Sequence, residues 1–109
     1  MKTDVYREEM ARLERAHAEA PTDPETACNL AMLYLAQQQD ARAEQILAPA
    51  LAAHPEHPRV QLHMAMALAH TATERAREHA EKALQGADDP ELRLQALGVR
   101  LMLQGHGLR

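Results

Sequence analysis

Apolar residues recur along this chain at a near-constant interval, in step with its prolines. Pro21 and Pro24 are followed 34 residues later by Pro55 and Pro58, and Pro90 comes after a further 32 residues. Three sets of residues align at this spacing: Leu30, Met64 and Leu97; Ala31, Ala65 and Gly98; and Tyr34, Leu68 and Leu101. Similarity at a fixed period of roughly 20 to 50 residues is typical of repeat architectures. The chain is therefore expected to contain tandem copies of one unit.

A second group of aligned residues lies downstream of the first, at a spacing of 33 residues. It pairs Ala43 with Ala76, Leu47 with Ala80, Ala50 with Ala83 and Leu51 with Leu84. Each unit is therefore expected to contain two helices, here termed helix A and helix B. Leu13, Ala16 and His17 fall at the places of Leu47, Ala50 and Leu51, so the first twenty residues are expected to form an unpaired helix B. In the second unit the turn is one residue shorter, and Thr71-Ala72-Thr73-Glu74 predicts a capping box there.

Aspartate and proline mark where the predicted helices begin. Asp23-Pro24-Glu25 and Asp89-Pro90-Glu91 each provide an aspartate as the cap and a proline in the first turn, where its missing N–H costs nothing. His57-Pro58-Arg59 is a copy with a weaker cap. These starts and the apolar spacing predict an all-α protein. Its helices are expected over residues 4–19, 25–37, 40–53, 58–70, 73–86 and 90–104.

The repeated pattern resembles the tetratricopeptide repeat: a small residue beside a leucine in helix A, a tyrosine one turn later, two alanines in helix B and a closing proline. The resemblance implies an α-solenoid of antiparallel helix pairs that forms a single domain over residues 1–109. Its parts are residues 1–20 (unpaired helix B), 24–57 (first repeat), 58–89 (second repeat) and 90–104 (terminal helix A). The small residues are expected to let helices A and B approach closely, because large side chains would wedge the pair apart. They are Ala31, Ala65 and Gly98 in helix A, and Ala43 and Ala76 in helix B.

Two features depart from the family pattern. Pro49 lies inside the predicted helix 40–53, where it removes a backbone hydrogen bond and predicts a kink near Gln45. The family often carries a bulky aromatic residue early in helix A, and Ala27 and Gln61 stand in that place here. The second departure is expected to affect the tightness of packing and not the fold.

In this family helix A of each pair lines the inner, concave surface, and the resemblance implies that partners bind there. The predicted lining residues are Cys28, Met32, Leu35, Leu62, Met66, Ala69, His70, Gln95, Val99 and Met102. Met32 and Met66 recur at the same point of consecutive repeats, and flexible thioethers suit a surface that adapts to irregular apolar side chains. One interpretation is a groove for an amphipathic helix or an extended apolar peptide. The other is a methionine stripe that is part of the core, or a groove filled by the chain's own termini or another subunit.

Some relatives use this surface to hold the carboxylates of acidic chaperone tails, with Lys, Asn and Arg side chains at set places. The corresponding places here hold Cys28, Met32, His63, Leu92 and Ala96. Of these only His63 is able to carry a positive charge, and the unperturbed pKa of histidine is about 6.5. A heat-shock co-chaperone role is therefore not expected.

The predicted terminal helix 90–104 is apolar around most of its circumference. Its apolar residues are Leu92, Leu94, Leu97, Val99, Leu101, Met102 and Leu103. Such a helix is expected to be buried, yet no helix B follows it, and solenoids need polar end caps. We therefore predict that a second chain covers its flank at Leu94, Leu97 and Leu101, in a symmetric homodimer. The alternative is a loosely packed terminal helix with an exposed apolar patch.

Composition and charge disfavour several classes of partner. The formal charge is −4 with interspersed signs, and two tyrosines are the only aromatic residues, so neither a basic stripe nor a stacking platform for nucleic acid is expected. No apolar run approaches the ~20 residues needed to span a bilayer, so no membrane role is expected. The start of the chain does not resemble a signal peptide, and the single Cys28 forms no internal disulfide. A cytoplasmic location is the resulting expectation.

The candidate chemical groups do not predict catalysis, a metal site or a cofactor. His63 and His70 are seven residues apart, about 10 Å along a helix, which is too far to share one ion. His54 and His57 flank a turn and would need metal ligands from elsewhere. Cys28 would need a nearby base to act as a nucleophile, and it is better interpreted as a small buried hydrophobic residue. Because the chain also has no glycine-rich phosphate loop and no nucleophile elbow, an enzyme is not expected.

The leading hypothesis is a protein–protein interaction scaffold whose concave helix-A surface binds an apolar or amphipathic segment of a partner protein. One alternative is a chaperone resembling the short tetratricopeptide chaperones of bacterial secretion systems, which shield a helical substrate until export. Another is a structural homo-oligomer in which the chain's own terminal helix is the ligand. The sequence does not identify the partner.

Overall fold

The computed structural model describes residues 2–105, which form six helices connected by short turns. The helices are α1 (Lys2–Glu19), α2 (Pro24–Ala36), α3 (Asp40–Ala53), α4 (Pro58–Leu68), α5 (Thr73–Gly86) and α6 (Pro90–Gly105). The prediction of an all-α fold with about six helices is confirmed. The observed ends differ from the predicted ones by at most two residues.

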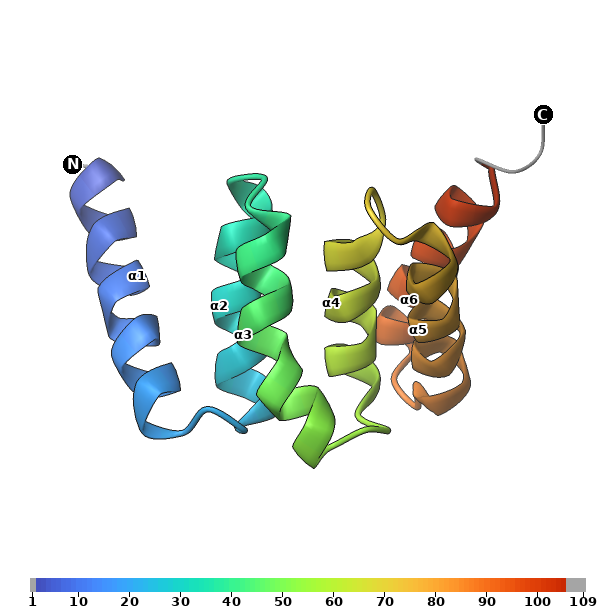
Figure 1. The fold of residues 1–109 in the computed structure, drawn as a ribbon, viewed down its shortest axis with the longest axis horizontal. Coiled ribbons are helices and arrows are strands. Elements are labelled where there is room, and N and C mark those ends of the chain that lie inside the picture. Colours follow the sequence, from blue (N-terminus) through green and yellow to red (C-terminus); the bar gives the residue numbers. More distant parts are fainter. Residues whose placement is uncertain (1, 106–109) are drawn as a thin grey trace.

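The helices are arranged as an elongated row of antiparallel elements with α1 at one end and α6 at the other (Figure 1). The array measures 43 × 28 × 25 Å. Helix α2 packs on α3, and α4 packs on α5. Helices α2, α4 and α6 also contact one another in succession, so the predicted helices A form one continuous layer.

Three of the helix starts follow the pattern read from the sequence. The Oδ2 atom of Asp23 accepts a hydrogen bond from the Thr26 N–H at 3.0 Å, and Asp89 accepts one from the Leu92 N–H at 3.2 Å. His57 caps α4 more weakly, since its Nδ1 accepts from the Val60 N–H at 3.4 Å. Each of these caps satisfies a backbone donor that the helix itself leaves unpaired.

The predicted capping box before α5 is wrong. Helix α5 begins after Ala72 and has no side-chain cap. The reason is that the chain leaves α4 through tight turns in which the Thr71 and Ala72 N–H groups both donate to the Leu68 carbonyl. The Thr73 hydroxyl donates backward to the Ala69 carbonyl at 3.3 Å.

Helix α3 continues without a break through Pro49. In Figure 1 its C-terminal turns bend toward the N-terminal end of α4. This bend leaves the contact between α3 and its partner α2 in place. The predicted effect of the proline is therefore local to α3.

Alanine side chains fill the contacts between paired helices. In the first pair Ala31, Ala43 and Ala50 are fully buried, and in the second pair Ala65 and Ala76 are fully buried. Leu30, Leu47 and Leu68 occupy the larger spaces between them. The close approach predicted from Ala31, Ala43, Ala65 and Ala76 is consistent with this burial.

The corresponding prediction for Gly98 is wrong. A Cβ atom added to Gly98 would meet no atom within 4 Å, because no helix packs on this side of α6 in residues 2–105. The small residue through which α6 does pack is Ala96, which is fully buried in a cluster with Ala83 and Leu62. The face of α6 around Gly98 therefore remains open.

Gln61 and two histidines form the polar part of the interior. The Nε2 of Gln61 donates to the Pro55 carbonyl, so its Oε1 accepts from Nδ1 of His79 at 2.6 Å. His63, which is almost fully buried, donates from Nδ1 to the Arg59 carbonyl at 2.9 Å. Gln61 thus occupies the place of the family's aromatic residue and links the turn before α4 to α5.

Helix α1 is attached to the rest of the chain by a small contact with α2. Leu13 is its buried core residue. The Tyr34 hydroxyl donates to Glu14 Oε2 at 2.5 Å, and the Arg42 guanidinium lies over the Tyr34 ring, 5.6 Å from its centroid. Among the described side chains of α1, those that are exposed are mostly charged: Asp4, Arg7, Glu8, Glu9, Arg12, Glu14, Arg15 and Glu19.

Replacing Ala65 by leucine is expected to destabilise the protein by about 1–3 kcal/mol, because three additional carbons must enter a filled helix contact. The matched control is Ala36→Leu, at an exposed position near the end of α2. Urea denaturation of both variants measures the difference. Equal free energies of unfolding for the two variants would contradict the packing described here.

Acidification is expected to destabilise the fold. Burial lowers the pKa of His57, His63 and His79, and the positive charges of Lys82 and Arg75 add to the effect at His79. The unfolded chain binds protons at histidine below pH ~6.5, whereas these folded histidines resist protonation. Their contribution is therefore fully present above pH ~6.5 and is lost as the pH falls through the lower pKa values of the folded state.

Urea denaturation at pH 7.5, 6.5 and 5.5 measures this dependence above the range in which carboxylates titrate. The free energy of unfolding should decrease between the first and last values. His79→Gln should weaken the dependence, because it removes one of the three resisting groups. A free energy of unfolding that is constant over this range would exclude the effect.

Candidate binding groove

A groove runs over the layer formed by α2, α4 and α6. It consists of two adjoining hollows of about 480 and 550 Å³, which share Met66, Val99 and Met102. The first hollow is also lined by Met32, Arg59, Leu62, His63, Gln95 and Gly98. The second is also lined by Leu35, Gln38, Asp40, Ala69 and His70. We refer to the two hollows together as the groove.

Helical periodicity places these side chains on one surface. Leu62 and Met66 of α4 and Ala69, the C-cap residue of this helix, follow one another at intervals of three or four residues, and Gln95, Val99 and Met102 do the same along α6. Leu62 and Ala69 are buried and form the floor. The methionines stand above it with exposed fractions of 48% for Met32, 36% for Met66 and 55% for Met102.

The structure brings together nine of the ten residues predicted to line this surface: Met32, Leu35, Leu62, Met66, Ala69, His70, Gln95, Val99 and Met102. The placement of Cys28 is wrong, because this residue is fully buried in the core and reaches neither hollow. Its side chain packs inside the layer instead of facing outward. Burial also raises the pKa of the Cys28 thiol to about 11, so the group stays protonated at neutral pH.

Arg59, Gln38, Asp40 and Gly98 line the groove without having been predicted to do so, whereas the resemblance had placed His63 on this surface. Arg59 and His63 lie at the end formed by the first turns of α4, and Gln38 and Asp40 lie at the opposite end. The spacing of residues 59, 62, 63, 66 and 70 along one helix is a signal that places Arg59 on the same face as Met66. No comparable periodicity identifies Gln38 and Asp40, because they lie in the turn between α2 and α3 and at the start of α3.

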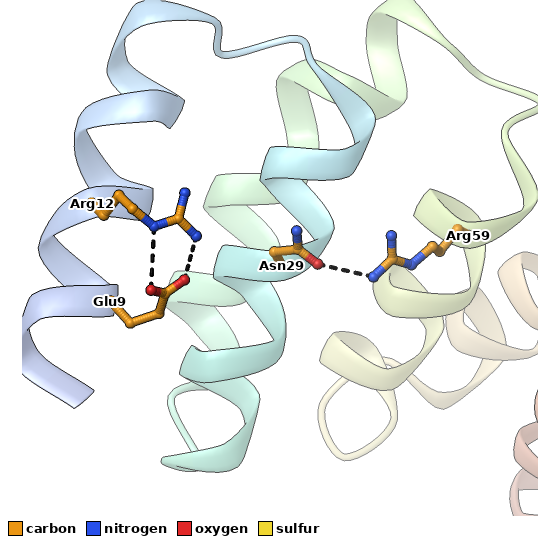
Figure 2. Close-up of polar contacts among 4 residues, drawn as sticks. All are labelled: Glu9, Arg12, Asn29 and Arg59. Carbon is orange, nitrogen blue, oxygen red and sulfur yellow. Dashed lines mark hydrogen bonds and ion pairs between the residues drawn. The ribbon is translucent and has the colours of Figure 1, made fainter. Parts of the chain in front are cut away.

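Arg59 is the positive charge at its end of the groove. Its Nη2 donates to the Asn29 side-chain oxygen at 3.0 Å, and Figure 2 shows the guanidinium reaching from α4 toward Asn29 on α2. The neighbouring charges in this view, Glu9 and Arg12 of α1, pair with each other. His63 adds no charge near neutral pH, since burial lowers its pKa.

A second exposed apolar surface lies at the end of the array, on the side of α6 that faces away from α4 and α5. Leu94 and Leu101 have exposed fractions of 69% and 57%, and Leu97 is exposed as well. Leu94 and Leu97 border a shallow hollow of about 270 Å³ together with Asp88, Pro90 and Arg93. We refer to Leu94, Leu97 and Leu101 as the end face.

The described residues offer no metal site and no membrane span. Within residues 2–105, no three His, Cys, Asp or Glu side chains lie close enough together to hold a metal ion. No described helix has the length and apolar character needed to cross a membrane. The groove and the end face are the two surfaces where large apolar side chains of α6 are exposed.

Comparison with known proteins supports the fold at the level of a family. The family model described as tetratricopeptide repeat matches residues 10–69, which is more than half of the 109 residues. No curated protein and no solved structure shows a significant match to the chain. The matched region contains most of α1, the pair α2 and α3, and all of α4. The chain belongs to the tetratricopeptide repeat family.

Proposed function

We propose that the protein is an interaction module whose groove binds an apolar or amphipathic segment of a partner protein. Tetratricopeptide repeats generally mediate protein–protein interactions, and the family is typically noncatalytic. The observation that carries the proposal is the row of exposed methionines, Met32, Met66 and Met102, over the buried floor of the groove.

Exposed methionines suit this function for a physical reason. Contact with an apolar partner removes their thioether and methylene groups from water, which contributes about 25 cal/mol for each Å² buried. Three rotatable bonds let each side chain adjust to the partner's shape. A surface of this kind accepts apolar residues at the helical spacing of an amphipathic segment, with polar groups at the rim.

The same groove serves either a general scaffold or a chaperone dedicated to one substrate. These two roles differ in the number of partners and not in the binding chemistry. Co-purification of one small partner in a 1:1 ratio from the native cell would favour the chaperone. Several unrelated partners competing for the groove would favour the scaffold.

Met66→Glu is expected to weaken binding of an apolar segment more than tenfold, because it places a charge in the part of the groove that both hollows share. The segment is obtained by selecting 16-residue peptides from a random display library on the immobilised protein. Fluorescence anisotropy of a labelled peptide then measures the affinity. Circular dichroism checks that the variant keeps its helicity.

The matched control is Val5→Glu, which places the same charge at an exposed apolar residue of α1, outside the groove. It should bind the selected peptide as tightly as the original chain. Equal affinity of the Met66→Glu variant and the original chain would exclude binding in the groove. Binding in the groove would also be excluded if the selection yielded no peptide whose affinity falls in the Met66→Glu variant.

We propose as a second function that the end face mediates self-association. The specific observation in favour is the exposure of three leucines, Leu94, Leu97 and Leu101, on one side of α6. An isologous contact buries the same patch on both copies and closes as a dimer. The charged outer side of α1 disfavours the head-to-tail alternative, in which the leucines would pack on that helix.

Leu101→Glu is expected to shift this self-association toward monomer, because an isologous contact near α6 would bury the new carboxylate twice. Light scattering at micromolar to millimolar concentrations measures the molar mass. Met32→Glu, on the groove, is the control and should behave as the original chain does. A monomer over the whole concentration range for the original chain would refute the association.

A further inference from the structure

The groove carries charges of opposite sign at its two ends. Arg59 lies at the end formed by the first turns of α4, and Asp40 lies at the other end with Gln38 and His70. We propose that Arg59 makes the groove selective for apolar segments that carry an acidic side chain, and that this carboxylate binds at the Arg59 end. The inference rests on the proposed function, because it specifies the partner of the same groove.

Arg59 is the arginine that lines the groove, and it is not among the arginines that form ion pairs within the described residues. Arg12 pairs with Glu9, Arg77 pairs with Glu74, and Arg100 pairs with Glu81. Within residues 2–105, no carboxylate lies within 4 Å of the Arg59 guanidinium. Its side-chain partner is the neutral amide of Asn29. The groove thus presents a cation that the chain itself leaves without a counter-charge.

The hydrogen bond to Asn29 prepares this cation for a ligand. A guanidinium has five N–H donors in a rigid plane, and Asn29 takes a donor on Nη2. The bond links α4 to α2 (Figure 2) and restricts the motion of the Arg59 side chain, which lines the groove. The hydrogen bond to Asn29 already orders the Arg59 side chain in the free protein. Binding of a carboxylate to the remaining donors therefore costs less side-chain entropy.

The surroundings of Arg59 strengthen its ion pair with a bound carboxylate. Arg59 shares its hollow with Met32, Leu62 and Met66, so a bound segment would exclude water from the ion pair. The other polar groups of this hollow are His63, which is neutral because burial lowers its pKa, and the uncharged Gln95. A charge pair that is partly shielded from water is stronger than one on an open surface.

Asp40 gives the bound segment a direction. Residues 59 and 70 are eleven residues apart on and just beyond α4, which corresponds to about 16 Å along the helix axis. An acidic side chain on the segment is attracted to Arg59 at one end of this distance and repelled by Asp40 at the other. The segment is therefore expected to lie with its acidic residue toward the first turn of α4 and its apolar residues over Met66 and Met102.

In the first test, one library of random 16-residue peptides is selected in parallel on the original chain and on the Arg59→Gln variant. Peptides that also bind the Met66→Glu variant are removed from both selections. Peptides from the original chain should combine apolar residues at helical spacing with an enriched Asp or Glu near one end. Peptides from Arg59→Gln should keep the apolar residues and lose the acidic enrichment. Acidic enrichment of equal strength in both selections, or in neither, would overturn the inference.

The second test uses the tightest peptide from the original chain and a copy in which its acidic residue is replaced by the matching amide. By fluorescence anisotropy the acidic peptide should bind the original chain about tenfold more tightly than the amide peptide. The two peptides should bind Arg59→Gln with equal affinity. Arg75→Gln, at an exposed position of α5, is the matched control and should keep the tenfold preference.

The outcomes separate this inference from the function on which it rests. Peptides that depend on Met66 but show the same acid-to-amide ratio on the original chain and Arg59→Gln would overturn the role of Arg59 and leave the groove function standing. The absence of any peptide that depends on Met66 would overturn both. A reduced thermal stability of Arg59→Gln does not affect the comparison, because both peptides are measured on the same variant.

Discussion

The close contact between paired helices is the constraint on which the rest of this structure depends. Ala31 and Ala43 in the first pair, and Ala65 and Ala76 in the second, are fully buried. An alanine contact contributes little apolar area, so each pair is held by many such contacts acting together. A larger side chain at one of them would separate the pair over several turns. The spacing of the pairs in turn sets the spacing of α2, α4 and α6.

The use of small side chains inside the pairs has an effect on the surface. The larger apolar side chains of α2, α4 and α6 stand partly outside the pair contacts, where Met32, Met66 and Met102 remain exposed. The groove is therefore a product of the packing and not a separate element added to it. Arg59, held by Asn29 across two helices, and Asp40 at the opposite end give this mostly apolar surface its two charges.

The sequence predicted the elements of this fold because the repeat encodes them twice. The helix ends and the Asp23 and Asp89 caps followed from the Asp-Pro starts and the apolar spacing. Most lining residues of the groove followed from the family resemblance together with helical phase. Two residues were misplaced because periodicity assigns a face, but neither the depth of a residue nor the presence of a neighbouring helix. Cys28 was assigned to the correct helix but lies below the surface, and Gly98 was assigned a contact that needs a further helix. The Arg59–Asn29 bond joins two repeats, so neither repeat contains the information for it.

The two ends of the array differ in a way that bears on how arrays of this kind change in length. The outer side of α1 is mostly charged, whereas α6 ends the described array with exposed leucines. A duplicated helix pair joined after α6 would find an apolar surface ready to pack on. The same pair joined before α1 would bury the charged residues of α1. These residues would first have to be replaced by apolar ones. Growth by gene duplication is thus physically easier in one direction of the chain than in the other.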